Sequence, residues 1–444
     1  VTVIGIGVSK TPAKDLLLNL GARVTAFDKK SADVLGLLGY ELTQKGANLS
    51  LGDGYLDHIR ADYIFRSPGV RPDNEGILKA ISKGAVLTSE MEEFFELCPC
   101  PIIGVTGSDG KTTTTTIISE ILKADGKNVF VGGNIGVPLL PKIDEITPDD
   151  YVVVELSSFQ LLTMKKSPHI SVITNITPNH LNWHKDMQEY VDAKLNIVRY
   201  QHDNDISVIN YNNGILKDYM PGIPGNVRCF SGTDSAGLPA GSIHVSDGYI
   251  CVGDEKVLAV SDIRIPGEHN VENYMAAIGA IGGLVKKECI QKVAKEFGGV
   301  EHRIEFVREV YGVKYFNSSI DSSPTRTIAA INAFNQKLIV ICGGYDKKVP
   351  YDPIGRPLCE KAKAVIVTGD TGPLIKQAIL DAPIYKKGNP DIYEASNYSE
   401  AIEIARDIAM RGDIVLLSPA SASFDSFKNF EERGRFFKEK VMSF

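Results

Sequence analysis

The stretch IIGVTGSDGKTTTTT, residues 102–116, constrains the fold more than any other part of the chain. Its apolar start predicts a buried parallel strand, and a glycine-rich turn then leads to Lys111 and a threonine run that opens a helix. This order is typical of a phosphate site, because backbone N–H groups and a helix N-terminus approach an anion there. The strict spacing G-x-x-x-x-G-K-[ST] requires glycine at 105, where this chain has Val105. The stretch therefore predicts a phosphate-binding loop of variant spacing.

Composition limits the class of protein. With 444 residues, two or three domains are expected, and 43% hydrophobic with 23% charged residues is ordinary for a soluble globular protein. The net charge of -7 argues against a nucleic-acid partner, and no apolar run reaches transmembrane length. We see no signal peptide, so we expect a cytoplasmic enzyme with no membrane partner. Because Val1 already lies in a strand-like run, we expect a short N-terminal piece to be missing.

The seven cysteines show no paired C-x-x-C spacing. Cys98 and Cys100 are too close in sequence for an ordinary zinc knuckle. We therefore expect reduced thiols with structural roles.

The first part of the chain follows a nucleotide-binding plan. Gly5-x-Gly7 lies between a strand and an amphipathic segment, and Asp28 ends the next strand. The third glycine of the dinucleotide fingerprint is replaced by Lys10, so the pattern is weak for NAD. Asp28 is placed to accept from a ribose hydroxyl and Lys29 to face phosphate, although both also fit solvated charges at a strand end. A later strand ends in Ser67-Pro68-Gly69, whose backbone N–H groups would suit another anionic group.

Polar side chains end two strands of the central part. Glu155 closes the valine-rich run 151–156, and His180 follows the run 170–176. Carboxyl ends of parallel strands are where open α/β sheets bind ligands, so we expect Glu155 to hold Mg²⁺ or bound water, with His180 beside it. A lone histidine is nevertheless more often structural. Lys194, on the amphipathic segment 190–200, has the pattern of a surface lysine.

The remaining segments suggest further α/β structure. Residues 203–265 predict a small mixed-sheet insertion, and Asn270 and Asn273 precede a helix expected over 274–285. From 337 onward, strands alternate with helices and end in Gly-, Asp- and Ser-rich loops, which predicts a second doubly wound domain. No nucleophile–base set is apparent, since Ser157 and Ser421 lack the G-x-S-x-G elbow. Phosphoryl transfer fits these parts, because it needs positioning and charge neutralisation more than covalent chemistry.

Several stretches together resemble the Mur ligase superfamily, in the expected order and over essentially the whole chain. They are GVTGSDGKTTTT, GGNIGVPL, VVVELSSFQL, ITNITPNHLNWH, YVDAKLNI, GEHNVEN, EHRIE and LLSPASASFDSFKNFEERG. The resemblance implies an α/β fold of three domains: an N-terminal Rossmann-like UDP-substrate domain (1–90), a central P-loop ATPase domain with a mainly parallel sheet (91–298), and a C-terminal Rossmann-like domain that binds the amino acid (299–444).

The ELSSFQL and SPASASFDSFKNFEERG stretches are most similar to the members that add D-glutamate to UDP-N-acetylmuramoyl-L-alanine in peptidoglycan precursor synthesis. Such a member is an ATP-dependent amide ligase. The substrate carboxylate attacks the γ-phosphate to give an acyl phosphate, the D-glutamate amine attacks in turn, and phosphate leaves. The resemblance also implies two Mg²⁺ sites, and it implies that Lys194 is modified to a carbamate.

The site residues are carried over from matching motif positions. For catalysis they are Lys111, His180, Lys194 and Arg303. For ATP they are Gly107, Ser108, Asp109, Gly110, Lys111, Thr112, Thr113, Asn134, Asn270, Arg303 and Asp321. For metal they are Thr112, Glu155, His180 and Lys194. For the UDP substrate they are Ser9, Asp28, Lys29, Ser67, Asn134 and Ser157, and for D-glutamate they are Lys347, Ser423 and Phe430.

The chain departs from the family pattern in two places. The family often has Asn-Asp-Ser-Lys where this chain has Asn317-Ser318-Ser319-Ile320. Ser318 therefore replaces the acidic residue that is expected at the ATP ribose. Asp321 is the candidate substitute. Asn179 stands where a related enzyme can have Asp before the histidine.

Three other functions are compatible with parts of this pattern. The chain is alternatively a Mur ligase for a different amino acid, an inactive nucleotide-binding homologue, or an NAD(P)-linked oxidoreductase. The last leaves the phosphate loop unexplained. We expect a monomer whose partners are small-molecule substrates.

Overall fold

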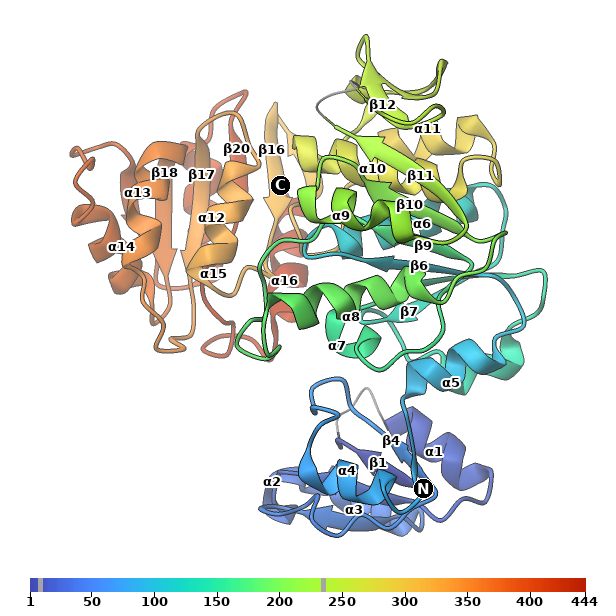
Figure 1. The fold of residues 1–444 in the computed structure, drawn as a ribbon. Helices are drawn as coiled ribbons and strands as arrows, with labels where there is room; N and C mark the ends of the chain where they lie inside the picture. The colour runs from blue at the N-terminus through green and yellow to red at the C-terminus, as the bar shows by residue number, and fades with distance from the viewer. Residues whose placement is uncertain (7–10, 233–236) are drawn as a thin grey trace. The chain divides into compact units, whose positions relative to one another are not determined.

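Three separate β-sheets carry the fold of this computed structural model, which describes residues 1–6, 11–232 and 237–444 (Figure 1). The chain forms two compact units. The first comprises residues 1–262 and 271–293, and the second comprises residues 263–270 and 294–444. Helices alternate with mainly parallel strands throughout, so the predicted α/β class is confirmed. The residue ranges of the three domains expected above stay a prediction.

The N-terminal sheet is fully parallel, with the strand order β3-β2-β1-β4-β5. Its strands are β1 (Thr2–Ile4), β2 (Thr25–Asp28), β3 (Asn48–Leu51), β4 (Tyr63–Phe65) and β5 (Val86–Thr88). The helices α1 (Thr11–Asn19), α2 (Ala32–Leu35), α3 (Leu37–Gln44) and α4 (Glu75–Ile81) connect these strands, and α5 (Glu90–Leu97) follows β5. Because β2, β1 and β4 are neighbours, the residues that follow them meet at one sheet edge, which is where Rossmann-like folds bind ligands.

The central sheet has nine strands in the order β14-β13-β12-β11-β10-β9-β6-β8-β7. The strands are β6 (Ile102–Thr106), β7 (Val129–Gly133), β8 (Tyr151–Glu155), β9 (Ile170–Ile173), β10 (Ile206–Asn210), β11 (Asn226–Ser231), β12 (Ile243–Ser246), β13 (Tyr249–Val252) and β14 (Glu255–Ala259). The helices are α6 (Lys111–Ala124), α7 (Ser158–Leu161), α8 (Met187–Arg199), α9 (Gly214–Tyr219), α10 (Glu268–Ile281) and α11 (Lys287–Glu296). Helices α10 and α11 each contribute residues to both units.

The phosphate-loop strand β6 lies between β8 and β9 in this sheet. Val105 pairs with Glu155, and Thr106 pairs with Ile173. The strands are buried on both faces, as expected of a parallel sheet covered by helices. This register places the loop after β6 directly between Glu155 and the segment that begins at Thr174.

Two expectations about the second half of the central part were wrong in detail. Strands β10 to β14 extend the nine-stranded sheet, with β12, β13 and β14 antiparallel, so they do not form a separate small insertion. Helix α10 begins at Glu268 rather than 274, so Asn270 and Asn273 lie inside its first turns. The hydrophobic pattern set the predicted start, whereas backbone hydrogen bonding extends the helix by further polar residues.

The third sheet has the order β15-β16-β20-β17-β18-β19, in which only the β15–β16 pair is antiparallel. Its strands are β15 (Glu305–Val310), β16 (Val313–Asn317), β17 (Leu338–Gly343), β18 (Ala362–Thr368), β19 (Asp391–Glu394) and β20 (Ile414–Leu417). Its helices are α12 (Pro324–Asn332), α13 (Asp352–Lys361), α14 (Gly372–Leu380), α15 (Tyr398–Ile408) and α16 (Phe430–Met442). The predicted doubly wound domain in the last third is therefore present.

Two further observations bear on the composition. Among the described residues, no helix is both long and apolar enough to cross a membrane. All seven cysteines are free thiols, and the sulfur atoms of Cys98 and Cys100 lie 3.8 Å apart.

Candidate active site

The glycine-rich loop requires glycine at two positions. Gly107 has φ +151°, and a Cβ atom there would lie 1.9 Å from the hydroxyl oxygen of Thr174. Gly110 has φ +79° at the N-cap of α6, and its Cβ would lie 2.4 Å from Oδ1 of Asn273. Both positions are left-handed and sterically closed, so the loop keeps its backbone exposed only with glycine.

Lys111 folds back onto this loop. Its Nζ donates to the carbonyl oxygens of Gly107 (2.9 Å) and Ser108 (2.8 Å). The loop is held on its other side by Asn175, whose Oδ1 accepts from the Asp109 N–H at 2.9 Å. The ammonium thus lies at the turn before the N-terminus of α6, and the phosphate contact expected for Lys111 stays a prediction.

Glu155 is almost fully buried and joins two other predicted residues. Its Oε2 accepts from Thr112 Oγ1 at 2.7 Å, and its Oε1 accepts from Asn134 Nδ2 at 2.7 Å. The approach is close because Gly133 has φ +97° and a Cβ there would lie 2.2 Å from the Glu155 carbonyl oxygen. A hydroxyl and a carboxylate side by side at a phosphate loop are the oxygen ligands that Mg²⁺ prefers.

Lys194 is not a surface lysine, so the pattern-based expectation was wrong. It is 2% exposed, its Nζ donates to the Gly107 carbonyl oxygen at 2.7 Å, and it lies 4.8 Å from the centre of the Tyr190 ring. Tyr190 also exchanges a 2.8 Å hydrogen bond with Ser108 of the loop. Burial lowers the pKa of the Lys194 ammonium well below its usual range, and the nearby charge of Lys111 lowers it further.

His180 lies in the same neighbourhood. It is exposed, has φ +55°, and packs edge-on against Phe159 with the ring centres 4.9 Å apart. Burial of its ring lowers the pKa of His180, and the charges of Lys111 and Lys194 lower it further. The structure therefore brings His180, Lys111 and Lys194 together at the carboxyl end of the central sheet.

The residues expected to bind metal do not form a complete cage of protein side chains. Among the described residues, no three His, Cys, Asp or Glu side chains gather as a metal centre. Mg²⁺ is usually bound by one or two carboxylates together with substrate phosphates and water. Thr112 and Glu155 fit that pattern, because both present oxygen atoms beside the phosphate loop.

The expected UDP-substrate residues of the first sheet are partly brought together. Both carboxylate oxygens of Asp28 accept backbone N–H groups, from Ile6 at 2.6 Å and from Lys30 at 2.9 Å. Gly5 has φ +97°, and a Cβ there would lie 3.2 Å from that of Ser67. Asp28 and Ser67 thus lie beside Ile6 and Gly5, which follow β1, and their contact with the UDP substrate stays a prediction.

The other residues assigned to the UDP substrate differ in setting. Ser9 lies outside the described residues, and Lys29 is exposed after β2. Ser157 is buried and caps α7 with a capping box, in which its hydroxyl accepts from the Gln160 N–H at 3.3 Å and Gln160 Oε1 accepts from the Ser157 N–H at 2.9 Å. Asn134 is exposed beside Glu155. Thr113 lies half-buried in the first turn of α6.

In the second unit, Arg303 lies in an unusual backbone segment. Its neighbours His302 and Ile304 have φ of +64° and +44°, which is uncommon for any residue and rare for a β-branched one. Asn317 Nδ2 approaches His302 Nδ1 at 2.9 Å, and Ser318 Oγ accepts from the Ile304 N–H at 3.2 Å. Backbone strain of this kind often marks a functional residue, which supports the role expected for Arg303.

Asp321 has a structural setting. It is 6% exposed, and its Oδ2 accepts from Ser418 Oγ at 2.8 Å. Burial raises the pKa of Asp321 to about 6, against hydrogen bonds from Ser318 and Ser418 and the charges of Arg326 and Arg303. Asp321 is thus held in a buried hydrogen-bonded setting, and the ribose contact expected for it stays a prediction. The replacement at 318 is also structural, since Ser318 is fully buried.

The remaining residues of the second unit follow strand ends and loops. Lys347 is exposed after β17, Ser423 is 2% exposed, and Phe430 begins α16 with its ring centre 6.0 Å from that of His302. Asn270 is buried, and its Nδ2 donates to the Pro266 carbonyl oxygen at 2.6 Å.

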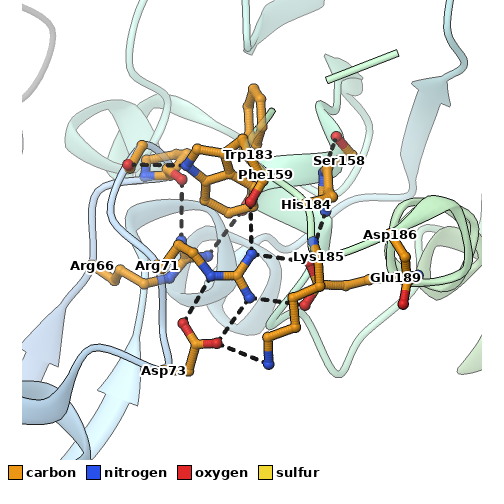
Figure 2. A network of polar contacts seen from close by, with 12 residues as sticks. Arg66, Arg71, Asp73, Ser158, Phe159, Trp183, His184, Lys185, Asp186 and Glu189 are labelled. Atoms are coloured by element: carbon orange, nitrogen blue, oxygen red, sulfur yellow. Dashed lines mark hydrogen bonds and ion pairs between the residues drawn. The ribbon is translucent and has the colours of Figure 1, made fainter. Parts of the chain in front are cut away.

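The sequence reasoning missed a network beside His180 that is shown in Figure 2. At its centre Arg71 pairs with Glu189, at 2.8 Å between NH2 and Oε1, although the two residues are 118 positions apart. Trp183, the only tryptophan of the chain, lies under the guanidinium at 5.0 Å. The available signals were that single tryptophan and the arginine that closely follows Ser67-Pro68-Gly69.

Comparison with known proteins places the chain in a family. The model of the Mur ligase middle domain matches residues 105–281, and the model described as "Mur ligase, glutamate ligase domain" matches residues 302–421. A UDP-N-acetylmuramoylalanine–D-glutamate ligase of Clostridium kluyveri is 49% identical over 440 residues, covering 99% of this chain and 95% of the relative. A relative of the same name from Acetivibrio thermocellus is 50% identical over 451 residues, covering 100% and 96%.

Solved structures of lower identity share the fold. UDP-N-acetylmuramate-alanine ligase from Thermotoga maritima superposes with a TM-score of 0.59 at 18% identity, covering 100% of this chain and 99% of that one. The MurF ligase from Thermotoga maritima in complex with ADP superposes with a TM-score of 0.53 at 17% identity, covering 91% and 92%.

The sheets, the phosphate loop and these matches define the protein as an ATP-dependent ligase. The chain belongs to the Mur ligase family. The resemblance predicted from its motifs is therefore confirmed.

Lys111 provides the first prediction. We expect Lys111→Ala to lower ATP-dependent phosphate release by about 10²-fold or more, because it removes the main positive charge at the loop. Circular dichroism would show an unchanged fold. The matched control is Lys123→Ala on the same helix, whose side chain is half exposed and paired with Glu120. Near-normal turnover of the Lys111 variant would refute the assignment.

Asp321 provides the second prediction, on pH dependence. Its pKa is raised when folded, from 3.8 to about 6, so folding favours the protonated form. The contribution of Asp321 to the free energy of unfolding is therefore fully present below pH 4 and is lost as the pH rises to 6, by about 2–3 kcal/mol in total. Asp321→Asn removes the ionisable group, so the variant should gain thermal stability relative to wild type as the pH rises from 4 to 7. A stability difference that does not change with pH would contradict this account.

Proposed function

We infer that the chain is an ATP-dependent ligase that joins D-glutamate to UDP-N-acetylmuramoyl-L-alanine in the synthesis of peptidoglycan precursors. The observation that carries this inference is the phosphate loop with Lys111, Lys194 and Glu155 around it, in a chain about half identical over its full length to ligases of that name. The predicted enzyme class and reaction are thus confirmed at the level of the family. The residue roles below are the finer part of the proposal.

The reaction forms one amide bond and cleaves one phosphoanhydride. A carboxylate oxygen of the L-alanyl substrate attacks the γ-phosphorus of ATP, which gives an acyl phosphate and ADP. The D-glutamate amine then attacks the carbonyl carbon, loses a proton, and inorganic phosphate leaves from the tetrahedral intermediate. No protein nucleophile is needed, which agrees with its absence from the sequence patterns.

Positively charged side chains around the loop would stabilise the negative charge that develops during the reaction. Negative charge gathers on phosphoryl oxygens and then on the carbonyl oxygen, and fixed positive groups stabilise it without reorganising. Lys111 would neutralise the β- and γ-phosphates, with Gly107, Ser108, Asp109, Gly110, Thr112 and Thr113 around them. Arg303 would also contact phosphate, and Asn134 and Asn270 would contact the adenine side.

Mg²⁺ is the metal that these residues fit. Thr112 and Glu155 would hold one ion, and His180 with modified Lys194 would hold a second. Bound there, the metal supplies Lewis-acid charge to the phosphates. In the structure Thr112 and Glu155 already bond to each other at 2.7 Å, so their oxygen atoms face one point.

The setting of Lys194 supports a carbamate. A carbamate forms when the neutral amine attacks carbon dioxide and a proton leaves. Burial lowers the pKa of Lys194, which favours the neutral amine. The anionic product would also relieve the repulsion between Lys194 and Lys111, since it replaces a positive charge with a negative one.

Substrate binding is assigned by sequence position. The UDP substrate would be bound by Ser9, Asp28, Lys29, Ser67, Asn134 and Ser157 on the domain proposed over 1–90 and the edge of the central domain. D-Glutamate would be bound by Lys347, Ser423 and Phe430 in the domain proposed over 299–444. A cytoplasmic monomer that contacts neither membrane nor nucleic acid is part of the same proposal.

Amino-acid dependence tests the function directly. We expect phosphate release from ATP, with Mg²⁺ and UDP-N-acetylmuramoyl-L-alanine present, to require D-glutamate. L-Glutamate, L-alanine, L-lysine and diaminopimelate should not support it. Release with a different amino acid would assign the chain to another ligation step. Release with none would favour an inactive nucleotide-binding homologue.

Lys194 is tested by rescue. Lys194→Ala should be nearly inactive and partly restored by a short carboxylic acid, which replaces the missing carboxylate. In the wild type, labelled bicarbonate should give a carbamate signal by nuclear magnetic resonance that the variant lacks. Lys165→Ala, at an exposed lysine of the same unit, serves as the control. Full activity of Lys194→Ala without rescue would exclude the carbamate.

A further inference from the structure

Arg71 uses every N–H group of its guanidinium. Nε and NH2 donate to the two carboxylate oxygens of Asp73 at 2.8 and 2.9 Å. NH1 and NH2 donate to the two carboxylate oxygens of Glu189 at 2.9 and 2.8 Å, and NH1 also donates to the carbonyl oxygen of Trp183 at 2.9 Å (Figure 2). The guanidinium further stacks 5.0 Å from the centre of the Trp183 ring. Only arginine offers this planar set of five donors.

The contacts on one side of Arg71 reach His180. The carbonyl oxygen of His180 accepts the N–H groups of Trp183 and His184, both at 3.0 Å, so the three residues form one turn. The His184 ring lies between Glu189, 3.3 Å from Nδ1, and Ser158, 3.0 Å from Nε2. Glu189 is itself fixed in the first turn of α8, where its N–H donates to the Asp186 cap at 2.8 Å. Arg71 therefore holds the turn that carries His180 through Trp183 and Glu189.

The contacts on the other side reach the loop Ser67–Gly69. The indole N–H of Trp183 donates to the Gly69 carbonyl oxygen at 3.3 Å. Arg66, which is 1% exposed, donates to the carbonyl oxygens of Pro68 (3.2 Å) and Val70 (2.8 Å), and through NH2 to that of Phe159 (2.9 Å). Phe159 packs against the His180 ring. The loop expected to bind the anionic substrate and the turn expected to bind metal thus share one set of contacts.

We propose that Arg71 is a positioning residue that couples the Ser67–Gly69 loop to the His180 turn, so that occupation of either site strengthens binding at the other. The proposal rests on the proposed function for the identity of the two ligands. A merely stabilising ion pair would affect unfolding alone, and partly exposed pairs contribute little even there. Coupling between sites is reciprocal, so it can be measured from either ligand.

Trp183 offers a direct reporter, because it is the only tryptophan and lies inside the network. Its fluorescence is followed during titration of the full chain with uridine diphosphate, the probe for the loop. Binding of ADP with Mg²⁺ is measured by calorimetry with and without saturating uridine diphosphate. In the wild type, we expect the dissociation constant for Mg²⁺-ADP to fall by about fivefold when uridine diphosphate is present.

The decisive variant is Arg71→Lys, which keeps the charge but loses the fork and the stacking. In this variant we expect uridine diphosphate to leave the dissociation constant for Mg²⁺-ADP unchanged, so that the fivefold ratio between the values without and with uridine diphosphate drops to about one. We also expect kcat to fall by about tenfold or more, while the fold is retained. Glu189→Gln is the second variant and should behave in the same way. Arg199→Lys is the matched control, because Arg199 pairs with Asp192 on the surface of α8, the helix that carries Glu189. This variant should keep the wild-type ratio of dissociation constants.

The outcomes separate this proposal from the proposed function. A folded Arg71→Lys variant with the wild-type ratio overturns the coupling role, and so does an active wild type with no coupling between the ligands. An absence of phosphate release with every amino acid overturns the proposed ligase function instead.

Discussion

Two lysine side chains donate to one backbone oxygen, the carbonyl of Gly107, with Lys111 at 2.9 Å and Lys194 at 2.7 Å. Burial lowers the pKa of the Lys194 ammonium well below its usual range, and repulsion from the nearby charge of Lys111 lowers it further. Nearby negative charge offsets this repulsion, as the carboxylates of Asp109 and Glu155 do for Lys194. Under the proposed function, triphosphate would supply further negative charge at Lys111, and a carbamate would supply it at Lys194. Both proposed groups are anions, which agrees with the positive charge of the two lysines.

The strand register of the central sheet brings the groups around the phosphate loop together. Strand β6 pairs with β8 on one side and β9 on the other, so the phosphate loop, Glu155 and the segment after β9 end at the same edge. Glycine at 107 and 133 is then required, because a Cβ at either position would meet Thr174 or the Glu155 carbonyl. Close backbone approach, rather than any single side chain, brings the groups within bonding distance.

Local patterns in the sequence predicted what depends on local structure. The strand, glycine turn and helix over 102–116, the acid at the end of β8, and the alternating elements of the last third all follow from periodicity and turn residues. Lys194 could not be predicted from periodicity, because helix α8 is buried along most of its length and polar spacing no longer marks the surface. Its role came only from resemblance to a family. The continuation of β10 to β14 into the central sheet was also missed, since strand pairing is a long-range property.

The Arg71 network marks the limit of sequence reasoning more sharply. Arg71 and Glu189 are 118 positions apart in the sequence, and no local rule pairs them. Yet each part has a local cause: Asp186 caps α8 and fixes Glu189, and the turn at His180 accepts the N–H groups of Trp183 and His184. Short rigid segments are thus defined by nearby residues, and one planar guanidinium with five donors joins them. Lysine, with a single point charge, would leave those segments correctly folded but separately placed.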